Sequence, residues 1–321
     1  MLTSPFAVDT IDERGGSVLV VAPGGTPPGP AALARLASLP CVVVAVDRSR
    51  DDKPPTHADL VVEPEVATID AVLAGVEANP QAATALALLL RGAGERSVGA
   101  GLVAESAVYS MLQSGPELAQ WRAEHPPRSR PDETEPELLV RRHGDRLDLQ
   151  LNRPHVRNAF NAAMRDRLVE ALALVVADDS ITEVVLRGTG AAFCSGGDLD
   201  EFATFGDAPS AHLVRLTASV GRALFELRDR VRAEIHGHCA GSGIELPAFV
   251  GEVVARPDLA VSLPELAMGL IPGAGGTLSL PRRIGRHRTA LLAVSGAVID
   301  ATTALEWGLV DAVRPDAGPL T

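Results

Sequence analysis

The sequence predicts an α/β fold, in which strands and helices alternate along the chain. Three observations lead to this prediction. Short runs rich in β-branched residues are bounded by turn residues, as buried strands are. Longer segments between these runs carry apolar residues at helical spacing. Hydrophobic residues make up 46% of the 321 residues and charged residues 22%, an ordinary mixture for a chain that builds a sizeable core.

One break in composition divides the chain. The stretch HPPRSRPDETEPE, residues 125–137, combines proline and charge without apolar periodicity, a pattern typical of a linker. A chain of this length has room for about two domains. We therefore predict a smaller mixed α/β domain over residues 1–124 and a second domain over residues 138–321.

The N-terminal part begins with a strand, a helix and a second strand. SVLVVA (17–22) and CVVVAVD (41–47) are the expected strands, and the segment 31–39 between them has a helical pattern. This order suggests a small parallel arrangement. Residues 79–123 are then expected to form a series of helices, because apolar residues recur there at helical spacing.

The C-terminal part alternates between strands and helices to its end. In the expected strand 146–152, leucines alternate with polar residues, so one face is predicted to be buried. A helix follows from about Asn161, and further strands are expected at 183–188 and 231–237. Between them, 211–228 is predicted to be one amphipathic helix. Its apolar stripe, which we expect to be core, consists of Leu213, Leu216, Val220, Leu224 and Leu227.

Charge and cysteine content exclude several classes of function. The net charge of −12 gives no sign of the basic face that nucleic acid requires. The longest apolar run, 85–90, is far too short to cross a bilayer, and no signal peptide is apparent. Cys41, Cys194 and Cys239 are too widely spaced for a CxxC metal site and are expected to be small buried thiols. We therefore expect a cytoplasmic protein that binds neither nucleic acid nor membranes.

Two glycine-rich turns follow predicted strands. The first glycine loop is GTGAAFCSGGDLDEF (188–202), and the second glycine loop is HGHCAGSGIEL (236–246). Glycines leave backbone N–H groups open to a ligand, and two such loops can aim two N–H donors at one oxygen as an oxyanion hole. Glycine turns without a function are the alternative for each loop taken alone. Neither loop has the spacing of a dinucleotide fingerprint, a P-loop or a nucleophile elbow.

Two acids stand out in apolar surroundings. Glu245 follows the glycines of the second loop at the expected start of a helix, and Glu265 follows Pro264 before another glycine-rich segment. Paired carboxylates in an apolar pocket can divide acid and base roles between them. The alternative for Glu245 is a carboxylate that only complements the helix dipole. His236 and His238 lack metal-ligand spacing, and no metal site is expected.

Five segments resemble the enoyl-CoA hydratase/isomerase, or crotonase, superfamily over about residues 138–312. They occur in the family's order and spacing, which makes the resemblance specific. The segments are LNRP with NA (151–159), AFCSGGDLDEF (192–202), AGSGIEL (240–246), PELAMGLIPGAGGTLSLPRRIG (264–285) and AVIDATTALEWGLVDAV (297–313).

The resemblance implies a fold and a site. The family fold is a spiral of stacked β-β-α turns, packed as homotrimers or as hexamers built from two trimers. The oxyanion amides of the family fall on Gly197 and Ser242, and the two glutamates of family hydratases match Glu245 and Glu265. A further segment is expected to face coenzyme A. Its residues are His155, Val156, Arg157 and Ser195.

With both acids present, the resemblance implies reversible hydration of a 2-enoyl-CoA, with coenzyme A as part of the substrate and no other cofactor. An isomerase or another CoA-thioester enzyme of the same fold is an alternative, and so is a non-catalytic acyl-CoA-binding subunit. Two positions depart from the family pattern. Gly251 stands where many relatives have an acid, and the oxyanion triplet is Gly-Ser-Gly.

The order of the parts also departs from the family. Relatives usually continue beyond the segment matched here with helices that cover the acyl site, whereas this sequence ends with GLVDAVRPDAGPLT. Residues 79–123 loosely resemble those helices. We expect this N-terminal segment to supply the same cover, in a rearranged order of the same parts.

Overall fold

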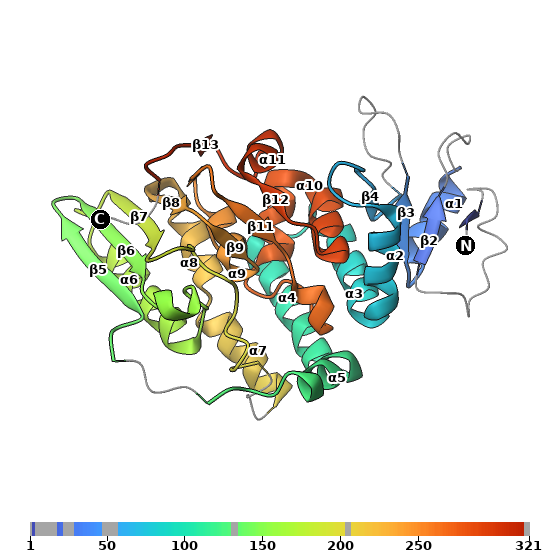
Figure 1. Cartoon of the computed structure of the whole chain (residues 1–321), viewed down its shortest axis with the longest axis horizontal. Helices are drawn as coiled ribbons and strands as arrows, with labels where there is room; N and C mark the ends of the chain where they lie inside the picture. Colours follow the sequence, from blue (N-terminus) through green and yellow to red (C-terminus); the bar gives the residue numbers. More distant parts are fainter. Residues whose placement is uncertain are drawn as a thin grey trace.

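The computed structural model describes residues 2–3, 18–21, 29–46, 57–129, 134–202 and 207–317. The ends of the predicted strands at 17, 22 and 47 lie outside these ranges, as do residues 130–133 of the predicted linker. The chain alternates between strands and helices, as the sequence predicts. Figure 1 shows the N-terminal strands at one end of the molecule and the hairpin of β5 (Leu138–His143) and β6 (Arg146–Leu151) at the other.

A parallel sheet opens the chain, with strand order β1-β2-β3-β4. Its strands are β1 (Leu2–Thr3), β2 (Val18–Val21), β3 (Val42–Ala45) and β4 (Leu60–Val61). Helix α1 (Pro30–Ser38) connects β2 to β3. The parallel pairing of β2 with β3 is the arrangement predicted from the strand-helix-strand pattern.

Four helices follow, within and just before the segment predicted to be helical. They are α2 (Ile69–Ala78), α3 (Pro80–Arg91), α4 (Val98–Gln113) and α5 (Pro116–Glu124). Prolines begin α3 and α5, where the missing N–H costs nothing. Thr68 and Ser97 cap α2 and α4 by accepting a hydrogen bond from a backbone N–H. The buried faces of these helices belong to the larger hydrophobic core, which they share with the C-terminal part of the chain.

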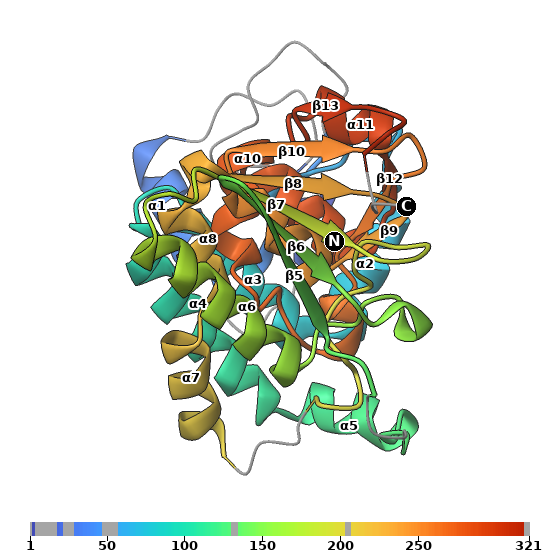
Figure 2. The ribbon, with the colours of Figure 1, turned by 90° about the vertical axis from the view of Figure 1, so that its left-hand side faces the viewer.

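The larger sheet has six strands in the order β13-β10-β8-β7-β6-β5, and all its pairs are parallel except that of β5 with β6. Figure 2 shows these strands fanned across one side of the molecule. The strands are β5 (Leu138–His143), β6 (Arg146–Leu151), β7 (Glu183–Gly188), β8 (Val231–Ile235), β10 (Glu252–Ala255) and β13 (Ala312–Val313).

A smaller sheet receives the second strand of successive turns, which gives the chain its spiral course. It consists of β9 (His238–Ala240), β11 (Ala260–Ser262) and β12 (Ile299–Asp300). β8 leads directly into β9, and β10 leads into β11. The helices of this part are α6 (Ala162–Ala177), α7 (Ala208–Thr217), α8 (Val220–Glu226), α9 (Ser242–Glu245), α10 (Gly276–Ser295) and α11 (Ala301–Glu306). None of the helices in the described ranges is both long and apolar enough to cross a bilayer.

Two details of the predicted pattern were wrong. The predicted helix 211–228 is split, because Ala218 leaves the helical conformation and Ser219 caps the new helix α8. Leu213, which was expected in the core, is 61% exposed. Strand β6 is buried on both faces, and its polar residue Asp148 forms an ion pair with the buried Arg187 of the neighbouring strand β7. An alternating pattern cannot distinguish a polar residue facing water from one paired inside.

Candidate active site

The two glycine loops lie side by side. Cys194 of the first loop and Cys239 of the second form a parallel β-bridge, and the N–H of Ala240 donates to the carbonyl of Cys194 at 3.1 Å. Gly243 packs so closely that a Cβ there would lie 2.1 Å from the Cys194 carbonyl oxygen. Only glycine permits this approach, so the residue type at position 243 allows the close contact that the fold creates.

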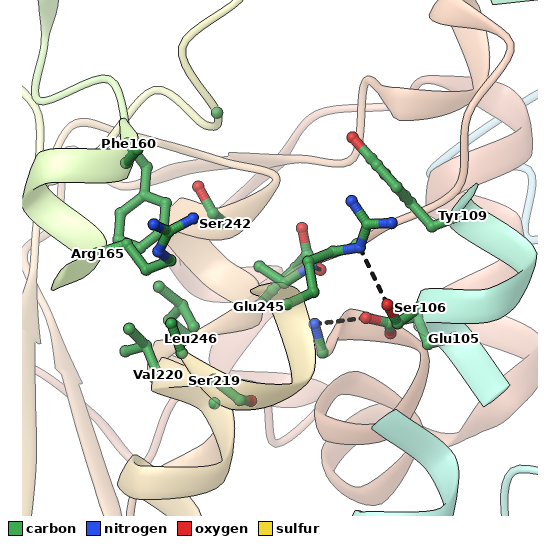
Figure 3. A pocket seen from close by; sticks show the side chains of 18 of the residues that line it. Glu105, Ser106, Tyr109, Phe160, Arg165, Ser219, Val220, Ser242, Glu245 and Leu246 are labelled. Atoms are coloured by element: carbon green, nitrogen blue, oxygen red, sulfur yellow. Dashed lines mark hydrogen bonds between the residues drawn. The ribbon is translucent and has the colours of Figure 1, made fainter. Parts of the chain in front are cut away.

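Each loop offers one backbone N–H to a common pocket. Phe160 pairs with Gly197 by accepting from the Asp198 N–H and donating to the Gly196 carbonyl, which leaves the Gly197 N–H without a carbonyl partner in the described ranges. Ser242 is the first residue of α9, and its N–H likewise has no such partner there. Gly197 and Ser242 both line the pocket of Figure 3, as the oxyanion-hole hypothesis requires.

The segment 151–159 holds the first glycine loop in place. Arg153 forms an ion pair at 2.9 Å with Asp198, the residue after Gly197, and both side chains are only 5% exposed. The Asn158 carboxamide accepts from the Arg153 N–H and donates to the carbonyls of Thr189, Ala192 and Phe193. Because these buried polar groups satisfy one another, the loop backbone is held in one conformation.

The two predicted acids meet in the same pocket. The Oε2 atom of Glu245 accepts the N–H groups of Ala274 and Gly276, each at 2.8 Å. Glu265 begins a 3-10 helix, and its buried Oε2 has no hydrogen-bond partner among the described residues. A Cβ on Gly241 would lie 2.1 Å from Oε1 of Glu265 and 3.7 Å from Oε1 of Glu245. Both carboxyl groups therefore converge at Gly241, in the space that a side chain at this position would occupy.

Burial changes the titration of both acids. Removal from water raises the pKa of Glu265 to about 7. Burial also raises the pKa of Glu245 well above its usual range, with a further contribution from the neighbouring Glu265. The two amide hydrogen bonds to Glu245 oppose this change. Two close carboxyl groups in a dry site cannot both ionise easily, so the pair retains a proton near neutral pH.

Comparison with known proteins agrees with this geometry. The sequence model of the enoyl-CoA hydratase/isomerase family matches residues 146–319, more than half of the chain. The 2,3-dehydroadipyl-CoA hydratase of Escherichia coli K12 is 36% identical over 185 residues, which cover 56% of this chain and 69% of that protein. The chain belongs to the enoyl-CoA hydratase/isomerase family.

Other relatives differ in their named activity. The 1,2-epoxyphenylacetyl-CoA isomerase of E. coli K12 is 35% identical over 174 residues, which cover 53% of this chain and 66% of that protein. The crystal structure of an enoyl-CoA hydratase from Mycobacterium smegmatis superposes with a TM-score of 0.53 at 33% identity, covering 57% of this chain and 72% of that one. The chain thus shares the mixed α/β crotonase fold of CoA-thioester enzymes, among which both hydratases and isomerases occur.

The four residues expected to face coenzyme A also lie together, but they are not among the pocket-lining residues. The Ser195 N–H donates to the Arg157 carbonyl at 3.0 Å, and the Ser195 hydroxyl donates to the Val156 carbonyl. His155 and Arg157 are exposed, and Arg157 adopts a left-handed conformation with φ of 54°. This surface adjoins the first glycine loop two residues before Gly197, and its role in binding coenzyme A stays a prediction.

Sequence reasoning named no individual residue of helix α4 as part of this crotonase-family pocket. One face of α4 lines it, at the helical spacing of Leu102, Glu105, Ser106, Tyr109 and Gln113. Glu105 accepts the N–H groups of Gly275 and Thr277 at 2.7 and 2.9 Å, and also the Thr277 hydroxyl. A charged residue within the apolar run GLVAESAVYSMLQ was the available signal.

Proposed function

We propose that the protein catalyses the reversible hydration of a 2-enoyl-CoA. The observation that carries this proposal is the convergence of two buried acids, Glu245 and Glu265, in one pocket with two backbone amides that have no carbonyl partner among the described residues. Isomerisation needs a single acid that moves a proton between two carbon atoms. Addition of water to a double bond uses two acids, one that accepts a proton from the water and one that donates a proton to carbon. The second acid is therefore the feature that favours hydration.

The amides of Gly197 and Ser242 bind the thioester oxygen. Negative charge develops on this oxygen as water adds to C3 of the conjugated double bond, and fixed N–H donors stabilise it without reorganisation. One such donor contributes about 2.7–4 kcal/mol in comparable oxyanion holes. Glu245 lies one helical turn beyond Ser242, so the same short helix, α9, positions both the acid and the amide.

Glu245 and Glu265 then divide the two protons. The pair shares one proton near neutral pH, and the reactive form is the one in which Glu265 holds this proton and Glu245 is ionised. The oxygen of a water molecule then forms a bond to C3, and Glu245 accepts one proton of that water. The electrons of the C2–C3 double bond move to the thioester oxygen. When this enolate collapses, Glu265 donates its proton to C2, and the pKa of about 7 for Glu265 suits a group that holds a proton near neutral pH. Dehydration follows the same path in reverse.

The proposed reaction uses no cofactor, and coenzyme A enters it only as part of the substrate. The surface formed by His155, Val156, Arg157 and Ser195 would hold the coenzyme A moiety next to the first glycine loop. Arg157 is exposed there and supplies a positive charge for a phosphate group.

Isomerisation of an enoyl-CoA is the second candidate. It is favoured by the relative named 1,2-epoxyphenylacetyl-CoA isomerase, at 35% identity. In that reaction Glu265 alone would move a proton and Glu245 would support it. Another CoA-thioester reaction or a non-catalytic acyl-CoA-binding subunit would use the same oxyanion site without both acids.

Variants of the two acids separate these candidates. Enoyl-CoA thioesters with short, medium and aromatic acyl groups are incubated with the wild-type chain, Glu245→Gln and Glu265→Gln, and loss of the conjugated thioester absorbance is followed. Hydration predicts a loss on the order of 10²–10⁴-fold in both variants, the usual contribution of general acid–base catalysis. Asp229→Asn, whose side chain is 85% exposed, is the matched control.

Each outcome decides between the candidates. Activity that survives Glu245→Gln but not Glu265→Gln favours isomerase chemistry. Thioester binding without turnover in the wild-type chain favours the binding subunit. Failure to bind any thioester contradicts all of them.

We also propose that the N-terminal helices cover the acyl site of this chain. The support is the contribution of α4 to the pocket and its contacts with α7 and α10. Assembly as a homotrimer or hexamer is a further expectation from the family resemblance, and a cytoplasmic location stays an expectation from the sequence. Deleting residues 1–124 tests the cover, because a shortened chain that stays folded, oligomeric and fully active would contradict it. Light scattering of the intact chain tests the assembly.

A further inference from the structure

A second polar region lies in the pocket beyond the acid pair. In Figure 3, Glu245 lies between Ser242 and Phe160 on one side and Ser106 and Tyr109 on the other. Arg215 of α7 also lines the pocket, and its guanidinium is tied to this second side. It lies 4.9 Å from the centre of the Tyr109 ring, and its Nε donates to the Ser106 hydroxyl at 3.0 Å. Arg215 therefore belongs to the side of the pocket formed by helix α4.

The guanidinium of Arg215 has only neutral acceptors. Besides Ser106, it donates to the Gln113 carboxamide oxygen at 3.0 Å and to the Ser110 hydroxyl. No carboxylate in the described ranges forms an ion pair with it. A guanidinium has five N–H donors, so these three hydrogen bonds leave two donors without a partner among the described residues. A half-buried positive charge without a negative partner is costly unless a ligand supplies one.

We propose that Arg215, with Ser106, Ser110 and Gln113, binds a carboxylate at the far end of the acyl chain. The substrate class is then the CoA thioesters of dicarboxylic acids. This inference rests on the proposed function for the orientation of the substrate, with the thioester at Gly197 and Ser242 and the acyl chain running past the acids. The open N–H groups suit a carboxylate because a guanidinium and a carboxylate are both planar and can form paired hydrogen bonds.

The competing explanation is that Arg215 only balances the charge of Glu105. The contacts speak against it, because both Glu105 oxygens are taken by Gly275 and Thr277 rather than by Arg215. Burial also raises the pKa of Glu105 to about 7, and the attraction of Arg215 is the smallest of its causes. A charge-balancing arginine would affect neutral and carboxylated ligands alike, whereas a carboxylate site distinguishes them.

The test measures binding rather than turnover. Titration calorimetry on the full chain compares saturated acyl-CoAs in pairs matched for length, namely glutaryl with valeryl, adipyl with hexanoyl and suberyl with octanoyl. In at least one pair, the carboxylated thioester is expected to bind tighter by on the order of tenfold or more, the size of a hydrogen bond to a charged group. Arg215→Met abolishes this ratio and leaves the affinity for neutral thioesters within about threefold. Arg215→Lys keeps the charge but loses the planar pair of N–H donors, and it retains part of the preference for the carboxylated thioester.

The control is Arg141→Met, which removes one positive charge from an exposed position on β5 and preserves the wild-type ratio. Equal binding within every pair by the wild-type chain overturns the inference, whether or not the variants fold. It is also overturned if Arg215→Met weakens both members of a pair equally. Failure of the proposed function looks different, because a chain that hydrates no enoyl-CoA but still prefers carboxylated ligands contradicts the chemistry and not the Arg215 site.

Discussion

Glu245 and Glu105 are the same residue type and bind the same short segment, yet they come from opposite parts of the chain. Glu245 accepts the N–H groups of residues 274 and 276, and Glu105 accepts those of residues 275 and 277. Alternate amides at the start of α10 are thus shared between the family-matched region and the N-terminal helices. Only Glu245 also converges with Glu265 over Gly241. Both acids are buried and both have a raised pKa, so neither property distinguishes them. What distinguishes them is their place relative to the oxyanion loops, which makes Glu245 a candidate catalytic acid and Glu105 a residue that holds the backbone in position.

The largest expected effect comes from the family-matched region. In Gly241→Ala, the new Cβ would lie 2.1 Å from Oε1 of Glu265 and would force this carboxyl group to move. We expect turnover of an enoyl-CoA to fall on the order of 10²-fold, because a displacement of about 1 Å at the reacting groups has that consequence. Steady-state kinetics measure it. Gly94→Ala, where nothing lies within 4 Å of the new atom, is the control, and equal activity in both would contradict the placement of Glu265.

The matching change in the N-terminal helices is expected to alter stability more than chemistry. Glu105→Ala leaves the N–H groups of Gly275 and Thr277 without their acceptor. We expect the free energy of unfolding to fall by about 1–3 kcal/mol, the usual consequence of a buried unsatisfied group. Urea denaturation measures this loss, with the exposed Glu95→Ala as control. A fall in turnover as large as that of Gly241→Ala, with unchanged stability, would instead give Glu105 a direct role in the reaction.

The raised pKa of Glu265 predicts how stability depends on pH. The unfolded chain loses the Glu265 proton near pH 4.5, whereas the folded chain keeps it to about pH 7. Between these values the folded state binds more protons, so this group lowers the free energy of unfolding as pH rises, by up to about 1.4 kcal/mol per pH unit.

Glu265→Gln removes this contribution. Urea denaturation at pH 5, 6 and 7 should show the variant gaining stability relative to the wild-type chain as pH rises. The control is again Asp229→Asn. A difference between Glu265→Gln and wild type that stays constant over this range would show that Glu265 titrates normally in the fold.

The smallest effect is expected at the surface next to the first glycine loop. If Arg157 contacts a phosphate of coenzyme A, Arg157→Gln raises KM a few-fold and leaves kcat unchanged, because exposed ion pairs contribute about 0.2–1 kcal/mol. The difference should disappear at high salt, where such charges are screened. Kinetics at low and high salt measure it beside Arg141→Gln. An unchanged KM at low salt would exclude Arg157 as a phosphate partner.

Much of the fold and of the site could be predicted from local patterns. The strand 183–188 and the helix from about Asn161 follow from apolar spacing, and both are confirmed. The spacing of Glu245 behind its glycines identified it as a candidate because a carboxylate is unusual there. The break at Ala218 and the exposure of Leu213 could not be predicted, because helical periodicity is the same whether a stripe meets the core, a pocket or water.

The sequence by itself determined the α/β alternation, the two glycine loops and the pair of acids. Each of these depends on residues close together in the chain, whose spacing fixes the conformation that they can adopt. The tertiary structure alone decided that the loops lie side by side, that the acids converge over Gly241, and that α4 and Arg215 complete the pocket. Glu105 and Thr277 are far apart in sequence, and no local pattern records which distant amide a buried carboxylate will accept.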